Sequence, residues 1–328
     1  MIEDTIARFY KAKNILVTGG TGLIGRKVAT ILADMGACVR IVSLDRIVAD
    51  PRCEHVFGDL TDFSFCKEIT RDTDFVFHLA GIKGSIDVTL HKPASHFVPA
   101  LMFNTNVLEA CRLNGVARLV YTSSIGAYAS AEVFREGENE SGPPMDFYAG
   151  WAKRMAEFQI QTYKIQYGLD SYFVVRPCNV YGPGDNFHPE NAMVIPSLIY
   201  KIFRGDDPVS VWGDGSAIRD FAFNGDVAKG IILTLYHGTG NHPYINLGGG
   251  KGYSIRELVE ALHGFLDFRP HFDATKPSGF PKRVMDITLA RELIGYNPST
   301  SLEEGLKQTW QWFIDNQGEY LRKQNYFI

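Results

Sequence analysis

A glycine-rich turn between a predicted strand and a predicted helix places the strongest constraint on this chain. The segment NILVTGG (14–20) is a short apolar run, and LIGRKVATILADMG (23–36) repeats apolar residues at helical spacing. The turn between them has Gly19, Gly22 and Gly25 at three-residue spacing. Glycines there let the backbone turn sharply and approach a pyrophosphate on the N-terminal end of the next helix. This position in a strand-turn-helix unit favours a dinucleotide-binding turn over an ordinary glycine turn.

Further apolar runs alternate with helical patterns over the first 182 residues. Strands are predicted at CVRIVSLD (38–45), TDFVFHLAG (73–81), ARLVYTSS (117–124) and LDSYFVVRPCNVYG (169–182), with a helix at FNTNVLEACRLNG (103–115). This alternation predicts the fold class α/β, with a doubly wound parallel sheet covered by helices on both faces.

The alternation ends after residue 182, where loop-rich stretches begin. Two later helices are expected to start near Ser254 and Ser301. We therefore predict a dinucleotide-binding Rossmann domain of residues 1–182 plus 222–252. Residues 183–221 plus 253–328 are predicted to form a smaller C-terminal cap that binds the substrate.

Composition and charge argue against several classes of protein. The 328 residues are 45% hydrophobic and 21% charged, which is enough to build a full core. The net charge is −4 and no run of Lys or Arg would follow a phosphate backbone, so no nucleic-acid partner is expected. The five cysteines are widely spaced without a CxxC pair, which argues against a metal site and favours a cytoplasmic location. No segment approaches the roughly 18 uninterrupted apolar residues of a membrane span, so no membrane partner is expected.

Beyond these patterns, the chain resembles the extended short-chain dehydrogenase/reductase family that modifies nucleotide sugars. The matching segments keep their order over nearly the whole chain: VTGGTGLIG, GDLTD (58–62), FHLAG (77–81), YTSSIGAY (121–128), RPCNVYGPGDNFHPEN (176–191), VWGDGSAIRDF (211–221) and SLEEGL (301–306). Within the family, NVYGPGDNFHPENAMVIPSLI and KPSGFPKRVMDIT look most like GDP-fucose synthases, which epimerise and then reduce a GDP-4-keto-6-deoxy sugar. The resemblance implies an NAD(P)-dependent enzyme that acts on a nucleotide sugar.

Residues that would hold the cofactor lie on several of these segments. Asp45 ends the second strand, where an acid can hold the adenosine ribose hydroxyls and favour NAD over NADP. Ser43 and Arg46 flank Asp45 and can instead receive a 2′-phosphate, so NADP is the alternative. The resemblance implies that Asp59 and Leu60 lie beside the adenine. The full set expected to contact the cofactor is Gly19, Gly22, Leu23, Ile24, Gly25, Asp45, Arg46, Asp59, Leu60, Leu79, Ala80, Gly81 and Lys153.

The resemblance also implies a catalytic set. Family members move a hydride between the nicotinamide and a sugar carbon, usually C4, while a tyrosine passes the hydroxyl proton. A lysine lowers the pKa of that tyrosine and holds the nicotinamide ribose, and a serine or threonine hydrogen-bonds the sugar oxygen. Ser124 matches the serine because it precedes Tyr128 by the family's interval, with Ser123 as the alternative. Tyr148 and Lys153 are the candidates for the other two roles.

Tyr148 stands five residues before Lys153, although the family's spacing is four. Asp146 is the expected N-cap of the helix that carries both. At about 100° per residue, a residue four before Lys153 lies about 40° from it around the axis, and one five before lies about 140° away. Regular geometry therefore puts Ala149 beside Lys153 and makes Tyr148 a core or rim aromatic. A bulge at Gly150 or a later helix start would return the phenol to the site.

The substrate contacts are inferred in the same way. The residues expected to bind the nucleotide sugar are Lys83, Ser124, Asn179 and Arg219. An amide donor at Asn179 and a charged fork at Arg219 suit the phosphates of the sugar nucleotide. For Arg219, the alternative is a surface ion pair with Asp220 or Asp226.

Departures from the family pattern argue against two of the reactions found in the family. GDP-fucose synthases carry a cysteine shortly after the serine and a histidine before the VIP segment, where this chain has Ile125, Gly126 and Met193. This argues against double epimerisation by that route. Nucleotide-sugar 4,6-dehydratases need an Asp-Glu pair after the serine, and SSIGAY has none. His188 and Glu190 are the nearest titratable replacements, although a loop histidine before a proline is more often only a polar contact.

Three functional hypotheses follow. The first is net redox at C4 of a GDP-hexose derivative, by 4-keto reduction or 4-hydroxyl oxidation. The second is 4-epimerisation with tightly held NAD, and the third is a cofactor-binding protein with little catalysis, motivated by Ala149. The helices of NTNVLEACRLNG and WAKRMAEFQIQTYKIQYG pair across a two-fold axis in this family, so the resemblance implies a homodimer.

Overall fold

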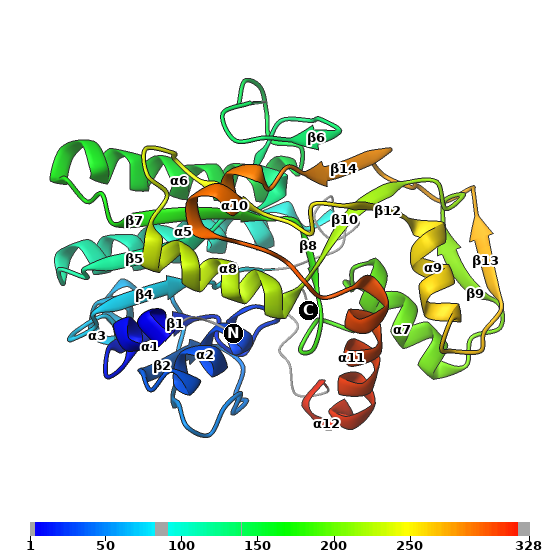
Figure 1. Cartoon of the computed structure of the whole chain (residues 1–328), viewed down its shortest axis with the longest axis horizontal. Coiled ribbons are helices and arrows are strands. Elements are labelled where there is room, and N and C mark those ends of the chain that lie inside the picture. The colour runs from blue at the N-terminus through cyan, green and yellow to red at the C-terminus, as the bar shows by residue number, and fades with distance from the viewer. Residues whose placement is uncertain (1–3, 83–90, 139, 321–328) are drawn as a thin grey trace.

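A computed structural model of the chain describes residues 4–82, 91–138 and 140–320. Most of its helices are labelled in Figure 1. They are α1 Asp4–Tyr10, α2 Gly25–Asp34, α3 Phe63–Ile69, α5 Pro93–Leu113, the 3-10 turn η1 Ile125–Ala127, α6 Phe147–Tyr167, α7 Val194–Arg204, α8 Asn224–His237, α9 Ile255–His263, α10 Thr288–Ile294, α11 Leu302–Asp315 and α12 Gln317–Tyr320. Its strands are β1 Asn14–Thr18, β2 Cys38–Ser43, β3 Glu54–Phe57, β4 Phe75–His78, β5 Arg118–Thr122, β6 Val133–Phe134, β7 Tyr172–Pro177, β8 Asn179–Tyr181, β9 Val209–Trp212, β10 Ile218–Phe223, β11 Ile245–Leu247, β12 Gly252–Ser254, β13 Pro270–Asp273 and β14 Lys282–Met285.

Seven strands form one parallel sheet in the order β11-β7-β5-β4-β1-β2-β3. The order reverses between β1 and β4, which is the crevice where such sheets bind ligands. Every residue of β4 and of β7 is buried, as expected for strands covered on both faces. Helices α3, α5 and α6 cover one face, and α2, α8 and α10 cover the other (Figure 1). The predicted fold class, α/β with a doubly wound parallel sheet, is confirmed.

Two predicted elements differ from the structure. The single strand predicted over 169–182 is two strands, because the chain leaves the large sheet after Pro177 and β8 pairs with β10 instead. The helix predicted over 103–115 is the second half of α5, which begins at Pro93. The first turn of a helix tolerates Pro93 because the N–H that proline lacks has no intrahelical partner there. Pro99 lies inside the helix, where proline is normally unfavourable, so the sequence pattern did not predict this half of α5.

Buried apolar residues form two clusters. The first fills both faces of the large sheet and includes residues around α10, such as Met285 and Tyr296. The second lies among α7, α9, α11, β9 and β10, on the right of Figure 1. The C-terminal part therefore has an apolar core of its own, beside the edge where β7 ends and β8 begins.

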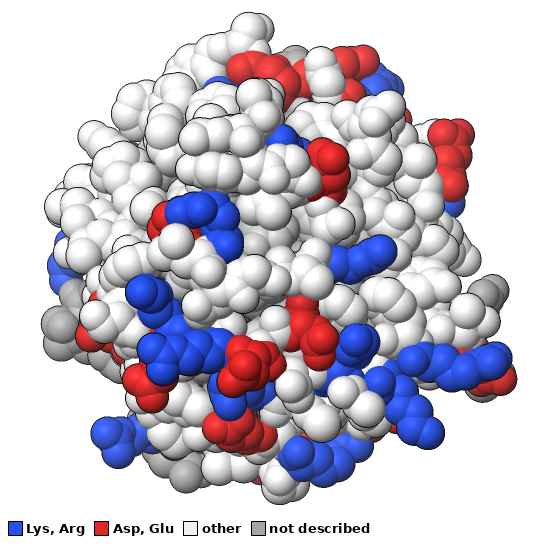
Figure 2. All heavy atoms as spheres, turned by 90° about the vertical axis from the view of Figure 1, so that its left-hand side faces the viewer, with Lys and Arg blue, Asp and Glu red and all other residues white. Residues whose placement is uncertain are grey.

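Charges of both signs are mixed on the face shown in Figure 2. Lys and Arg lie beside Asp and Glu over the lower part of this view and at its top edge, and the upper left is largely uncharged. Such mixing gives this face no extended field of one sign. Within the described ranges, no helix is long and apolar enough to cross a membrane.

Candidate active site

The glycine-rich turn joins β1 to α2 at the carboxyl edge of the large sheet. Gly19 has a φ of 67°, and a Cβ built on it would lie 2.8 Å from the Cα of Ala80. A Cβ on Gly25 would collide with the carbonyl oxygen of Gly19. Leu23 and Ile24 lie in the same turn, and no described side chain caps the N-terminus of α2, whose first turn has no acidic residue. The turn therefore fits the pyrophosphate of a dinucleotide.

Side chains predicted to hold the adenosine follow β2 and β3, which are neighbours in the sheet. Asp45 is half-buried, and Thr21 donates a hydrogen bond from Oγ1 to its Oδ2 at 3.1 Å. Arg46 beside it is exposed. Asp59 accepts a bond at 2.8 Å from the backbone N–H two residues later, and Leu60 is buried. Because both strands are parallel, these residues lie at the same edge as the glycine-rich turn.

The loop after β4 carries Leu79, Ala80 and Gly81. The backbone N–H groups of Leu79 and Ala80 both donate to Oγ1 of Thr18 at 3.2 Å. The same Oγ1 is hydrogen-bonded to Nδ1 of His78 at 2.7 Å in the buried core. These bonds hold the loop against the end of β1, next to Gly19.

Lys153 lies on α6 and faces this loop. Its Nζ donates to the backbone oxygen of Thr122 at 2.7 Å and lies 5.2 Å from the centroid of the Tyr121 ring. A Cβ built on Gly81 would be 3.8 Å from Nζ. Burial lowers the pKa of Lys153 to about 8, against the opposing effect of Glu157. An ammonium group has three donors, so a lysine held here suits a ribose hydroxyl beside the loop.

Two serines follow β5, and the structure separates them. Ser124 is half-buried, and its Oγ accepts the N–H of Gly126 at 3.1 Å, which caps η1. Ser123 is buried and donates its Oγ to the carboxylate of Glu157 in the interior. This difference favours Ser124 as the serine available to a ligand.

Helix α6 begins at Phe147 with regular geometry. The N–H of Gly150 donates to the carbonyl of Asp146 at 2.6 Å, an ordinary helical bond. A Cβ on Gly150 would collide with the carbonyl oxygen of Gly126, so the helix start is packed directly against η1. The bulge and the later helix start considered from the sequence are therefore wrong, and Ala149 lies one turn before Lys153.

Tyr148 lies at the outer side of this helix start. It is 42% exposed, and its ring contacts the rings of Phe147 and Phe97, with centroids 5.2 and 6.5 Å away. The structure thus places the phenol on a surface aromatic group. Its part in proton transfer stays a prediction.

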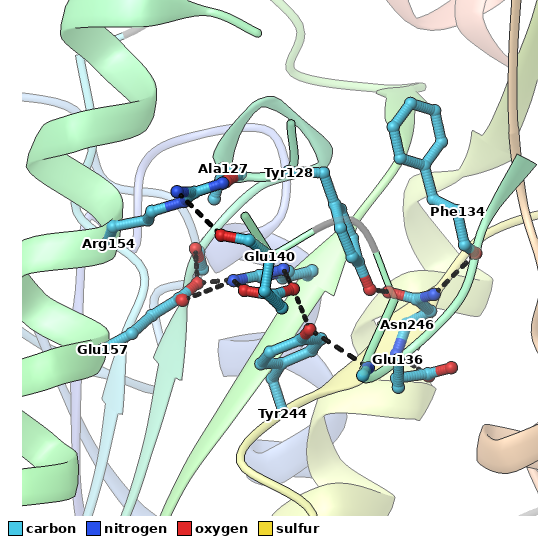
Figure 3. A network of polar contacts seen from close by, with 12 residues as sticks. Ala127, Tyr128, Phe134, Glu136, Glu140, Arg154, Glu157, Tyr244 and Asn246 are labelled. Carbon is cyan, nitrogen blue, oxygen red and sulfur yellow. Dashed lines mark hydrogen bonds and ion pairs between the residues drawn. The ribbon is translucent and has the colours of Figure 1, made fainter. Parts of the chain in front are cut away.

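An ion network around the buried Arg176 includes Glu157, which lies one helical turn after Lys153 on α6. Arg176, in β7, is 1% exposed and donates to Glu157 at 2.6 and 2.9 Å and to Glu140 at 2.8 Å. Its guanidinium lies 3.5 Å from the ring centroid of Tyr244, and Figure 3 shows Glu140, Glu157 and Tyr244 converging. Sequence reasoning missed this network. The signals available were an arginine inside the apolar strand YFVVRP and a glutamate four residues after Lys153.

Two residues proposed for the substrate lie on β8 and β10, which pair with each other outside the large sheet. Arg219, in β10, donates to two backbone carbonyls at 2.8 and 2.9 Å, and burial together with nearby Arg283 lowers its pKa to about 10. Among the described residues it forms no ion pair with Asp220 or Asp226, so that alternative is wrong. Asn179, in β8, donates from Nδ2 to the backbone oxygen of Asp220 at 3.0 Å. Lys83 lies outside the described residues.

Two further expectations concern Asp146, as the N-cap of α6, and His188, as a polar contact in its loop. Asp146 occupies the N-cap position of α6 but makes no capping bond within the described chain, because its carboxylate pairs with Arg283 at 3.3 Å. Nδ1 of His188 accepts the N–H of Glu190 at 3.4 Å, a polar contact of the kind expected for that loop.

Comparison with known proteins identifies the family. The model of the NAD dependent epimerase/dehydratase family matches residues 15–248. A probable GDP-L-fucose synthase 1 of Oryza sativa subsp. japonica is 31% identical over 322 residues, with 93% of each chain covered. An epimerase structure from Methanothermobacter thermautotrophicus has a TM-score of 0.87 at 26% identity, with 97% of each chain covered. The UDP-glucose 4-epimerase of Thermotoga maritima, solved with UDP-glucose, has a TM-score of 0.81 at 28% identity, with 93% of this chain and 99% of that chain covered. The resemblance inferred from the motifs is confirmed: the chain belongs to the NAD dependent epimerase/dehydratase family and is an NAD(P)-dependent enzyme.

Proposed function

We propose that this enzyme is a nucleotide-sugar oxidoreductase that acts at sugar C4 of a GDP-hexose derivative. The observation that carries the proposal is the position of Lys153. Its Nζ is hydrogen-bonded to the Thr122 carbonyl and faces the loop of Gly81, and the glycine-rich turn that fits a dinucleotide lies next to this loop. The similarity to a GDP-L-fucose synthase over 93% of the chain supports the GDP-hexose class. When bound, the nicotinamide cofactor exchanges a hydride with the sugar carbon.

The described residues then have distinct tasks. Lys153 binds the nicotinamide ribose, and Ser124 hydrogen-bonds the oxygen on C4. Arg219 and Asn179 contact the phosphates of the sugar nucleotide, where a partly desolvated guanidinium gives a strong charge-assisted bond. Lys83 is assigned to the substrate from the sequence alone. Tyr148 is the candidate for proton transfer inferred from the sequence, although its phenol lies at the surface, and Tyr148→Phe tests that role directly.

The two parts of the chain divide these tasks. Residues 1–182 plus 222–252 hold the dinucleotide, and residues 183–221 plus 253–328 form the cap over the sugar nucleotide. Two separate apolar clusters support this division, although the residues around α10 pack with the first cluster.

Our choice of NAD over NADP rests on Asp45. Its carboxylate follows β2 and accepts a hydrogen bond from Thr21, a position that suits ribose hydroxyls and repels a 2′-phosphate. Arg46 is exposed beside it, and NADP is preferred if that guanidinium turns toward the ribose.

Absorbance of the reduced nicotinamide tests the proposed reaction. The enzyme is mixed with enzymatically made GDP-4-keto-6-deoxymannose and either NADH or NADPH. A steady loss of absorbance establishes a 4-keto reductase, and the faster trace identifies the preferred cofactor. Lys153→Met is the control and is expected to be about 10²-fold slower, because the cofactor is no longer positioned. A flat trace with both cofactors would contradict the reductase proposal.

Epimerisation at C4 is the second candidate, favoured by the structural similarity to a UDP-glucose 4-epimerase. It predicts NAD retained at one equivalent per chain through purification and conversion of a GDP-hexose without net absorbance change. Freely exchanging cofactor favours net redox instead. Cofactor binding without turnover of any sugar would identify a binding protein with little catalysis.

A homodimer formed through α5 and α6 completes the proposal. These helices and the residues at their ends expose large apolar side chains, namely Val98, Met102, Leu113, Phe147, Met155, Phe158, Ile165 and Tyr167. Ile165 is 80% exposed, an unfavourable state unless a partner covers it. The cytoplasmic location is proposed because all five cysteines are unpaired, which fits a reducing compartment.

A further inference from the structure

The proposed reaction at C4 moves a proton as well as a hydride, so a side chain must exchange that proton with the oxygen on C4. The position one helical turn before Lys153 is Ala149, whose methyl group has no proton to exchange. Tyr148, the neighbouring phenol, is turned onto Phe97 at the surface. The site therefore lacks an acid-base group at the position where the family's spacing would place one.

His96 lies in the first turn of α5 and is 6% exposed. Its Nε2 is 2.8 Å from the backbone oxygen of Ile82. A carbonyl oxygen only accepts, so Nε2 carries the hydrogen and the neutral ring has its lone pair on Nδ1. Within the described part of the chain, this Nδ1 is buried and has no hydrogen-bond partner. A buried, unpaired ring nitrogen carries a desolvation cost, which a ligand hydroxyl would relieve.

The surroundings of His96 place it at the candidate active site. Its partner Ile82 directly follows Gly81, and Nζ of Lys153 is 3.8 Å from the Cβ position of Gly81. The next residue on α5, Phe97, contacts the ring of Tyr148 at the start of α6. His96 thus lies between the loop after β4 and the helix that carries Lys153.

The charges around His96 favour its neutral form. Burial lowers its pKa below the ordinary value, and Lys153 on α6 acts in the same direction. The bond to Ile82 and the carboxylate of Asp146, just before α6, act in the opposite direction. At neutral pH the ring is therefore ready to accept a proton at Nδ1.

We propose that His96 is the acid-base group that exchanges the proton with the oxygen on C4, and the assignment rests on the proposed function. In oxidation, Nδ1 takes the proton of the 4-hydroxyl, and the hydrogen on C4 leaves as a hydride that the oxidised nicotinamide accepts. The sugar then has a C4=O group, and His96 is an imidazolium ion. In reduction, the Nδ1–H of the imidazolium returns the proton to the carbonyl oxygen as the hydride arrives at C4. The Nε2–H remains on the Ile82 oxygen in both directions, so the ring keeps its orientation.

Another histidine near the site does not offer the same atom. His78 is fully buried at the end of β4, and its ring nitrogens are hydrogen-bonded to Thr18 at 2.7 Å and to Asn104 at 3.0 Å. Its imidazole is therefore committed to holding β4 against α5 and β1. His96 combines burial, proximity to Lys153 and a ring nitrogen that has no hydrogen-bond partner among the described residues.

A binding experiment tests the assignment without turnover. Enzyme labelled with nitrogen-15 in its histidines and holding NAD is titrated with GDP-mannose and, in parallel, with GDP-4-deoxymannose. The Nδ1 signal of His96 is expected to shift with GDP-mannose and to stay in place with the 4-deoxy sugar, because only the former has a hydroxyl to donate. Binding of both ligands without a shift overturns the His96 assignment alone. If neither ligand binds, the proposed GDP-hexose substrate is wrong, and the His96 assignment falls with it.

Kinetics provide the second test, on the sugar that the enzyme turns over. His96→Gln keeps an N–H donor for the Ile82 oxygen but removes the basic nitrogen, and we expect kcat to fall about 10²- to 10⁴-fold with unchanged cofactor affinity. In the wild type, kcat/KM for oxidation should fall as the pH drops through the pKa of His96, and this dependence should vanish in the variant. His263→Gln, at an exposed histidine that ends α9, is the matched control and should keep near-normal kcat. A large loss in Tyr148→Phe with an active His96→Gln would assign the proton to the phenol and overturn the proposal.

Discussion

The candidate site depends on single residues whose size or charge is set by their surroundings. Gly25 must lack a side chain because the carbonyl oxygen of Gly19 occupies the Cβ position. Burial lowers the pKa of Lys153, although the Thr122 carbonyl and the carboxylate of Glu157 stabilise its ammonium form. At the residue scale, substitutions at Gly25 and Lys153 therefore have specific expected effects on cofactor binding and on stability.

Gly25→Ala is expected to weaken dinucleotide binding at least tenfold. The added methyl group pushes the turn away from α2, which costs about 1–3 kcal/mol of overpacking and moves the amide groups that face the pyrophosphate. Calorimetric titration with NAD and NADP measures the effect. Gly318→Ala is the control, since a Cβ there meets nothing within 4 Å. Equal affinities for the two variants would contradict the placement of the cofactor.

Lys153→Met is expected to change how stability depends on pH. The pKa of Lys153 is about 8 in the folded protein and 10.5 as a model value, so between these pH values the unfolded chain binds more protons and wild-type stability rises with pH. Methionine removes this rise. The stability of the variant relative to wild type should therefore be greater at pH 7 than at pH 10.5, by roughly 2–3 kcal/mol. Urea unfolding at both pH values measures the difference, and a difference independent of pH would contradict the lowered pKa.

At the scale of elements, the position of α6 determines where Lys153 lies. Its start packs on η1 through Gly150, and its middle is tied to β7 by the pair of Glu157 and Arg176. Both contacts join α6 to elements close to it in the chain. Such buried ion pairs are costly to break, because the remaining charge stays desolvated.

Glu157→Gln is expected to destabilise the fold by about 3 kcal/mol, because the buried Arg176 guanidinium keeps only Glu140 as its charged partner. Urea unfolding at pH 7 measures the loss. Glu54→Gln is the matched control: its pair with Arg40 has side chains 56% and 35% exposed and should contribute less than about 1 kcal/mol. Similar losses in the two variants would show that the network does not hold α6.

At the scale of the whole molecule, α5 and α6 contribute both to the candidate site and to the proposed dimer interface. Their inner sides pack on the large sheet and carry His96 and Lys153, while their outer sides expose the apolar residues proposed to form a dimer. Dimer formation would cover the outer side of the same helices that position the site. If the proposed dimer forms, the oligomeric state would be linked to the geometry of the proposed site.

Phe158→Glu is expected to convert the dimer to a monomer, because it places a charge in the centre of the proposed apolar interface. Light scattering during size exclusion measures the mass, which should be twice the chain mass for the wild type and once for the variant. Trp212→Glu, at an exposed aromatic residue on β9, is the control and should remain dimeric. A wild-type protein with the mass of one chain would contradict the dimer.

The sequence by itself determined the features that local pattern encodes. Strand and helix periodicity predicted the parallel sheet, the glycine spacing predicted the dinucleotide turn, and the angle between positions predicted that Ala149 lies beside Lys153. These features depend on backbone geometry within a few residues, so one chain segment is enough to specify them. The family resemblance extended them to site residues such as Ser124 and Asn179.

Only the tertiary structure decided which distant residues meet. It moved β8 out of the large sheet onto β10, bound Arg176 to Glu140 and Glu157, and paired Asp146 with Arg283. It also brought His96 to the loop that faces Lys153, with one ring nitrogen unpaired among the described residues. The physical reason is that such contacts are set by how helices and strands pack across the sheet, and packing depends on the shape and burial of side chains that are far apart in the chain.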